Sequence, residues 1–292
     1  MTCGHEMEIL RSPQMCLLEQ QPEIHIIDAD FNEGEHGVYI MQTHEDPEAR
    51  RRFEIVNRIL GWGNPCVPIW FIGLEEADEW GNPLTSKNEE TLRKYEKCHT
   101  GWIPQAEGQI KEDALEWKKK YTKIYDIMSK LVLEVKGEKL SDWKIYRNEK
   151  LFIDPDACQA NLYPLAKKNH KKKLPEKYGP LFGFNPEDSE RYREIVSKTR
   201  FLELKKSWEQ ARPAITVCFG ADEDDIKEVF GTLLGAKEAE FKIGNCSCAL
   251  YSSGIILTPF FARYLMPNEC IHGLVERLRP LLNHCTFPHN QL

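Results

Sequence analysis

Short apolar runs that do not alternate with polar residues constrain the fold of this chain more than any other feature. The clearest runs lie at residues 67–72 and 214–219, and a glycine follows each of them directly. A continuous apolar run of this length is typical of a strand that is buried on both faces, as in a parallel sheet covered by helices. Residues 159–162 and 254–257 predict two further core strands, of which the first ends in the segment that starts at Asn161.

Segments with apolar residues spaced three and four apart separate these runs and predict amphipathic helices. The predicted helices occupy residues 46–60, 106–135, 185–210, 222–234 and 268–282. Asn185 is expected to cap the third helix, with Pro186 at its first helical position. Buried strands that alternate with helices indicate an α/β fold, here a three-layer α/β/α arrangement around a short parallel central sheet.

The order of these elements indicates one α/β domain over residues 46–285. The sequence contains no internal repeat and no low-complexity linker that would divide this domain. Residues 1–45 are expected to form an N-terminal extension with a short hairpin, and residues 286–292 a tail. A second hairpin is predicted at residues 240–243 and 247–251.

Charge and cysteine content limit the class of protein. The 292 residues include 39 Lys and Arg against 46 Asp and Glu, and the resulting net charge of −7 counts against a protein that coats nucleic acid by bulk electrostatics. The longest apolar stretches fall well short of the roughly 20 residues that cross a bilayer, and no secretion signal is recognised. We therefore expect a cytoplasmic protein without a membrane partner, whose ten cysteines are free thiols.

Two carboxylates lie on the turn that follows the first apolar run. Gly73 and Leu74 precede Glu75 and Glu76, at the strand end where parallel sheets place their ligand sites. A carboxylate in such a cleft is partly desolvated, so its pKa tends upward and it can hold or activate a water molecule. On the pattern alone, a simpler explanation is that Glu75 and Glu76 cap a following helix or face solvent.

An asparagine ends the second predicted core strand. The side-chain amide of Asn161 offers two donor hydrogens and an acceptor, which suits it to read the edge of a base. Asparagine at a strand end is also an ordinary turn former, so this residue alone does not decide between the two roles.

Read together, the strand ends resemble those of the uracil-DNA glycosylase superfamily. The segments concerned are residues 73–77, 161–164, 217–220 and 257–265, and the resemblance extends from about residue 67 to residue 282. Gly73 matches the glycine of the family's first motif, and Glu75 matches the position that activates or positions water. Asn161 matches the base-reading asparagine, and Pro259 matches the proline of the His-Pro-Ser loop. The resemblance implies a base-binding site made of Gly73, Leu74, Glu76, Asn161 and Pro259.

The chain departs from the family's pattern at several motif positions. Glu76 and Ala77 replace the usual Pro-Gly or Pro-Tyr, Thr258 replaces the histidine and Phe260 replaces the serine. In the family, the histidine donates to the base oxygen on which charge develops, and loss of such a donor in other enzymes costs about 10²–10³ in rate. The resemblance thus implies Glu75 and Thr258 as the catalytic pair, with Thr258 a shorter substitute for the histidine.

Candidate nucleic-acid contacts flank these motifs. Phe260 and Phe261 are placed to act as an apolar wedge in a base stack, and Arg263 to meet a phosphate, although both phenylalanines can equally pack beneath the last helix. A basic run after Asn161 is suited to a phosphate backbone, although such runs are usually solvated loops. Its candidate contact residues are Lys167, Lys168, Lys171, Lys172 and Lys173.

No metal site and no cofactor are expected. The Asp28-x-Asp30-x-Asn32 pattern resembles the start of an EF-hand loop, but Glu33 occupies the position that requires glycine. The sequence also lacks the glycine-rich motifs of dinucleotide and triphosphate sites. The leading hypothesis is therefore recognition of a base in DNA, with or without hydrolysis of its N-glycosidic bond. The alternatives are a non-enzymatic binding module with the same fold and a hydrolase of small N-glycosides.

Overall fold

A computed structural model describes residues 47–74, 89–90, 92–93, 122–165, 173–183, 185, 187–243, 246–259 and 268–282. The expected N-terminal hairpin, the first half of the helix at 106–135 and the tail lie outside these residues, as do the predicted domain boundaries at 45 and 286. Within the described part of the chain, no helix is both long and apolar enough to cross a membrane.

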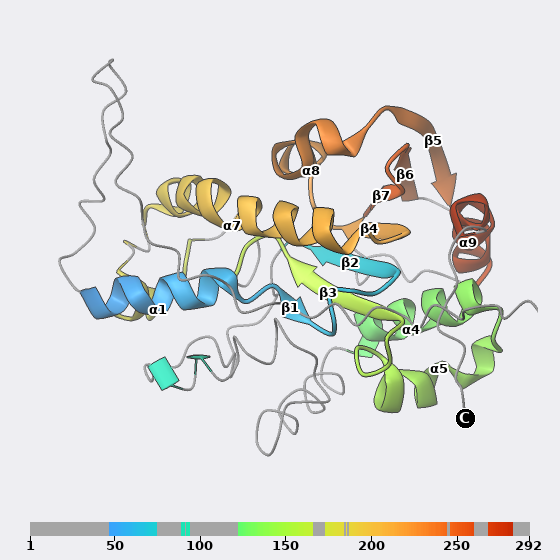
Figure 1. Ribbon diagram of the computed structural model, residues 1–292, viewed down its shortest axis with the longest axis horizontal. Coiled ribbons are helices and arrows are strands. Elements are labelled where there is room, and N and C mark those ends of the chain that lie inside the picture. The colour runs from blue at the N-terminus through green and yellow to red at the C-terminus, as the bar shows by residue number, and fades with distance from the viewer. Residues whose placement is uncertain are drawn as a thin grey trace, which may run out of the picture. The chain divides into compact units, whose positions relative to one another are not determined.

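A seven-stranded mixed sheet forms the centre of the fold, in the order β1-β3-β2-β4-β7-β6-β5 (Figure 1). Four neighbouring strands are parallel, and they are β3 (Ala157–Asn161), β2 (Ile69–Gly73), β4 (Ile215–Phe219) and β7 (Ile255–Thr258). Three antiparallel strands flank them, namely β1 (Gly61–Trp62), β6 (Cys246–Tyr251) and β5 (Lys237–Ile243). The α/β class is therefore confirmed. The sheet is mixed because β1 runs antiparallel to β3 at one edge and the predicted hairpin, β5 and β6, adds two strands beside β7 at the other.

The longer helices agree closely with the apolar periodicity. They are α1 (Pro47–Arg58), α4 (Thr122–Lys136), α7 (Ser189–Ala211), α8 (Glu223–Phe230) and α9 (Asn268–Leu282). The shorter helical segments are η3 (Leu140–Asp142), α5 (Trp143–Ile145), η4 (Tyr146–Lys150), α6 (Tyr178–Phe182) and η5 (Gly231–Leu234). Helix α4 packs against α9, and α7 packs against α1 and α8.

Helices lie on both faces of the sheet. Trp208 of α7 donates a 2.8 Å hydrogen bond to the hydroxyl of Thr216 in β4, which places α7 on the face that carries Thr216. The guanidinium of Arg277 in α9 lies 4.8 Å from the ring centroid of Phe241 in β5. Because side chains alternate along a strand, the strand pairings assign Phe241 to the opposite face. The buried apolar residues of all four parallel strands belong to one continuous core.

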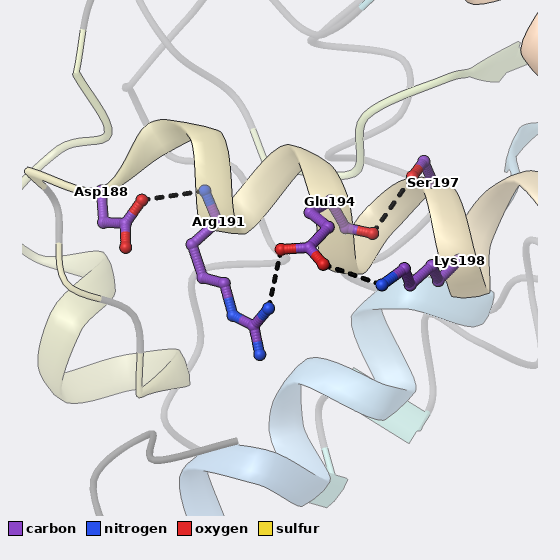
Figure 2. Close-up of polar contacts among 5 residues, drawn as sticks. All are labelled: Asp188, Arg191, Glu194, Ser197 and Lys198. Carbon is purple, nitrogen blue, oxygen red and sulfur yellow. Dashed lines mark hydrogen bonds and ion pairs between the residues drawn. The ribbon is translucent and has the colours of Figure 1, made fainter. Parts of the chain in front are cut away.

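The start of α7 differs from the prediction. Asp188, and not Asn185, caps the helix, because its carboxylate accepts a 2.9 Å hydrogen bond from the backbone N–H of Arg191 (Figure 2). The side chain of Asn185 instead accepts from the N–H of Glu187, two residues further on, and forms a turn before the helix. Hydrogen bonds from Lys198 and Arg191 lower the pKa of Glu194 in the first turns of α7.

A buried carboxylate lies at the amino end of β3, at the edge opposite the predicted site. Asp156 accepts 2.8 Å hydrogen bonds from Lys136 and from the hydroxyl of Tyr146. Burial raises the pKa of Tyr146, and the charge of Asp156 raises it further. Burial alone would lower the pKa of Lys136, but its bonds to Asp156 and Glu138 outweigh that effect and raise it. The cluster joins α4 and η4 to the start of β3.

Candidate functional site

The four parallel strands end in one row, and this row forms the candidate site. Asn161 of β3 pairs with Gly73 of β2, Gly73 pairs with Phe219 of β4, and Phe219 pairs with Thr258 of β7. Paired residues on neighbouring strands direct their side chains to the same face of the sheet. The fold therefore brings three residues that the sequence analysis singled out, Asn161, Gly73 and Thr258, to one edge and one face.

The amide of Asn161 lies directly beside Gly73. A Cβ atom at Gly73 would lie 2.8 Å from Oδ1 of Asn161 and 3.0 Å from Cζ of Phe219. Real Cβ atoms essentially never come as close as 2.8 Å, and 3.0 Å is tighter than most real contacts, so a side chain at position 73 requires the Asn161 amide or the Phe219 ring to shift. Gly73 thus leaves the space that the side chains of Asn161 and Phe219 occupy.

We expect Gly73→Ala to destabilise the protein by about 1–3 kcal/mol, because the added methyl group forces Asn161 or Phe219 from its place in a packed row. Urea unfolding measures this change. Gly273→Ala in α9 is the matched control, because nothing lies within 4 Å of a Cβ atom there. Alanine favours helix over glycine by about 0.5–1 kcal/mol, so this control should be stabilised. Equal stability of the Gly73→Ala variant and the native protein would contradict the close packing.

A buried arginine fixes the backbone of Asn161. The side chain of Arg200 in α7 is 1% exposed and donates two hydrogen bonds, of 2.9 and 3.2 Å, to the carbonyl oxygen of Asn161. It also donates to the carbonyl oxygens of Asn57, Ile59 and Leu60, at and just beyond the carboxyl end of α1. This end of a helix carries partial negative charge, which favours a cation. Arg200 thereby ties α1 and α7 to the end of β3.

The second connection of Asn161 runs through its own N–H, which donates a 3.2 Å hydrogen bond to the carbonyl of Leu60. Beyond the strand end, the N–H groups of Leu162 and Tyr163 donate to the carbonyl oxygens of Gly73 and Leu74, both at 2.9 Å. The two chain segments therefore stay side by side after the strands end. Leu74 takes part through its backbone, while its side chain packs against the core.

Thr258 is 2% exposed, and its hydroxyl lies within the sheet. Oγ1 is 3.3 Å from the carbonyl oxygen of Cys218 and 3.3 Å from that of Pro259, and these two main-chain acceptors share its single proton. The carbonyl oxygen of Thr258 accepts from the N–H of Gly220. The hydroxyl proton is thus directed at the protein's own backbone, which differs from the donor role that the resemblance implies.

Lys173 is the only candidate phosphate contact among the described residues, and its ammonium forms an ion pair with Glu187. The remaining candidates lie outside the described residues, and they are Glu75, Glu76, Phe260, Phe261, Arg263, Lys167, Lys168, Lys171 and Lys172. The structure therefore describes the floor of the predicted site and leaves the role of these residues as predictions.

Next to the row lies a hydrogen-bonded tyrosine–aspartate pair that the sequence did not predict. The hydroxyl of Tyr163 donates a 3.1 Å hydrogen bond to Asp225 in the first turn of α8. The guanidinium of Arg193 in α7 lies 5.0 Å from the centroid of the Tyr163 ring, and its Nε is buried without a hydrogen-bond partner. Burial raises the pKa of Asp225, although Tyr163 and Arg193 oppose the shift. Burial also raises the pKa of Tyr163.

This pair predicts a pH dependence of stability. Because the pKa of Asp225 is higher in the folded than in the unfolded chain, the folded protein holds the proton more tightly. The contribution of Asp225 to stability is thus greatest below its unfolded pKa and decreases as pH rises through the folded pKa. We expect Asp225→Asn, which keeps an acceptor for Tyr163, to gain stability relative to the native protein as the pH rises above about 3.9, the pKa at which an Asp of the unfolded chain ionises. Thermal unfolding at pH values on both sides of this pKa tests it, and parallel curves would contradict it.

Buried thiols lie close to the row but do not offer a nucleophile. Burial raises the pKa of Cys218 in β4 and that of Cys158 in β3, so both remain protonated at neutral pH. The side chains of Cys66, Cys158, Cys218, Cys248 and Cys270 are free thiols. No group of three or more potential metal ligands occurs among the described residues.

Comparison of the chain with protein-family models, with curated protein sequences and with solved structures finds no match.

Proposed function

We propose that the row formed by Asn161, Gly73, Phe219 and Thr258 is the floor of a site that recognises a base in DNA, in the manner of the uracil-DNA glycosylase superfamily. One observation carries this proposal. The strand register places the amide of Asn161 beside Gly73, which are the two positions that the resemblance assigns to base reading and to the adjacent motif glycine.

The geometry of Asn161 supports a reading role because its main chain is fully engaged. Its N–H and its carbonyl bond to Leu60 and Arg200, so the side chain projects from a backbone that other elements hold in place. A polar group that must discriminate between bases gains from such preorganisation, since little ordering remains to be done on binding.

Hydrolysis of the glycosidic bond is the second part of the proposal, and it depends on Glu75. The carboxylate would activate a water molecule for attack on the sugar carbon, while the base leaves with the bond electrons. The engagement of the Thr258 hydroxyl with the main chain favours a modest rate or binding without turnover, because no donor for the departing base is identified at that position.

The test uses oligonucleotides of one sequence that differ at a single base, which is uracil, hypoxanthine, xanthine, a mismatched normal base or the matched normal base. We expect one modified base to be bound about tenfold or more tightly than the matched base, as one good set of base-edge hydrogen bonds provides. Alkaline cleavage at an abasic site reports hydrolysis, with Glu75→Gln as its control. Equal binding of all oligonucleotides would refute base recognition, and discrimination without abasic sites would identify a binding module.

A further inference from the structure

Gln159 lies on the same strand as Asn161 and directs its side chain to the same face. The two residues are separated by one position in β3, so both side chains point toward the face that also carries Phe71 and Gly73. Gln159 is 8% exposed, and its Oε1 is buried without a hydrogen-bond partner. It is therefore a buried acceptor on the same strand as the candidate base-reading amide of Asn161, two residues before it and deeper in the sheet.

The backbone around Gln159 is closely packed on both sides. The residue pairs with Phe71 of β2 and with Trp62 of β1. A Cβ atom at Gly61 in β1 would overlap the carbonyl oxygen of Gln159, so the two strands approach more closely there than a side chain would allow. The backbone of Gln159 is therefore closely held on the side of β1.

A buried acceptor without a donor is costly, and an apolar side chain of the same length would avoid that cost. Of the neighbours of Gln159 across the sheet, Phe71 is apolar, and Trp62 carries one polar group, an indole N–H that is also buried and forms no hydrogen bond with Gln159. A donor on a bound molecule would satisfy the Oε1 acceptor of Gln159. The other buried, unpartnered oxygens of the described residues, such as Ser129 Oγ in α4, do not share a strand and a face with Asn161.

We infer that Oε1 of Gln159 is a second acceptor of the same site and bonds to a ring N–H of the bound base; this rests on the proposed function. Residues two apart on a strand are separated by about 6.6 Å, a distance that one base bridges between the two amides. Asn161 offers donors as well as an acceptor, whereas Gln159 adds an acceptor below it. The pair thus selects bases with a lactam edge, in which a carbonyl and a ring N–H are adjacent, as in uracil, hypoxanthine and xanthine, over adenine and cytosine, which lack that edge.

Gln159→Met tests this inference because methionine keeps the length of the side chain and removes the acceptor. We expect a melting temperature equal to or above that of the native protein, and about tenfold weaker binding of the preferred oligonucleotide, the loss typical of one good hydrogen bond. Binding of the matched oligonucleotide with adenine or cytosine at that position should not change, because neither base has a ring N–H beside a carbonyl. Gln159→Leu provides a second apolar replacement.

Ser129→Ala is the matched control, since it also removes a buried oxygen without a partner but from α4. It should leave the binding of both oligonucleotides unchanged. The inference would be overturned if both Gln159 variants bound the preferred oligonucleotide with native affinity. It would also be overturned if the variants lost equal affinity for both oligonucleotides and melted at a lower temperature than the native protein. If Asn161→Ala nevertheless abolishes discrimination, the proposed function survives that result. If the native protein itself discriminates no base, the proposed function fails and the inference fails with it.

Discussion

Replacing Arg200 by methionine is expected to lower the free energy of unfolding by about 3–5 kcal/mol, the range found when one partner of a buried charged network is removed. The side chain makes five hydrogen bonds to four carbonyl oxygens. Methionine fills most of the volume but removes the arginine donors from all four carbonyls, of which that of Leu60 keeps the N–H of Asn161 as a donor. Each acceptor that stays buried and unsatisfied costs about 1–3 kcal/mol. Urea unfolding, followed by circular dichroism, measures the change.

Arg200→Lys should recover only a small part of this loss. Lysine keeps the charge, but its single nitrogen cannot reach acceptors that the planar guanidinium meets with three nitrogens. The matched control is Arg191→Met, on the same helix, where the side chain forms an ion pair with Glu194 at the surface (Figure 2). Such pairs contribute about 0–1 kcal/mol. A loss at Arg200 no larger than that at Arg191 would contradict the role assigned to the buried network.

Replacing Asn161 by alanine is expected to reduce the preference for a modified base by about 10- to 100-fold, because a base edge loses both its donor and its acceptor. The main-chain bonds of Asn161 to Leu60 and Arg200 do not depend on the side chain, so the strand end should remain in place. Equilibrium binding of the modified and matched oligonucleotides measures the effect, with circular dichroism to verify the fold.

Asn161→Asp separates the two halves of the amide. The carboxylate keeps the acceptor but loses the donors and adds a negative charge, so a base that presents a carbonyl oxygen should be rejected. Asn148→Ala is the control, since this exposed asparagine lies in η4 and away from the strand ends. Unchanged discrimination in both Asn161 variants would refute the assignment of base reading to this residue.

The strands of the core were predictable because a strand that is buried on both faces appears in the sequence as a short run of apolar residues without alternation. The run at residues 214–219 became β4 (Ile215–Phe219), and the run at 67–72 became β2 (Ile69–Gly73). The last helix was predicted at its observed bounds, Asn268–Leu282. Once the strands are parallel, their carboxyl ends must share an edge, and for this reason Asn161, Gly73 and Thr258 could be expected to converge.

Contacts that depend on how helices pack were not predictable. Arg200 lies four residues from Val196 and four from Leu204, both buried, so its position on the apolar stripe of α7 was the available signal. Its partners are carbonyl groups, which every residue has, and the sequence cannot identify them. The bond between Tyr163 and Asp225 likewise requires α8 to lie against the segment after β3. The cap of α7 was misjudged because Asn185 and Asp188 are both good capping residues.

The network around Arg200 has a consequence for how this chain can change over evolutionary time. Its acceptors are supplied by the main chain of Asn57, Ile59, Leu60 and Asn161, so substitutions at these four positions leave the acceptor atoms in place. The donor has no such freedom, because only arginine presents several N–H groups in one rigid plane. No second mutation at a partner can therefore restore the network once the arginine is lost. Substitutions are therefore tolerated at the residues that supply the acceptors but not at Arg200, which supplies the donors.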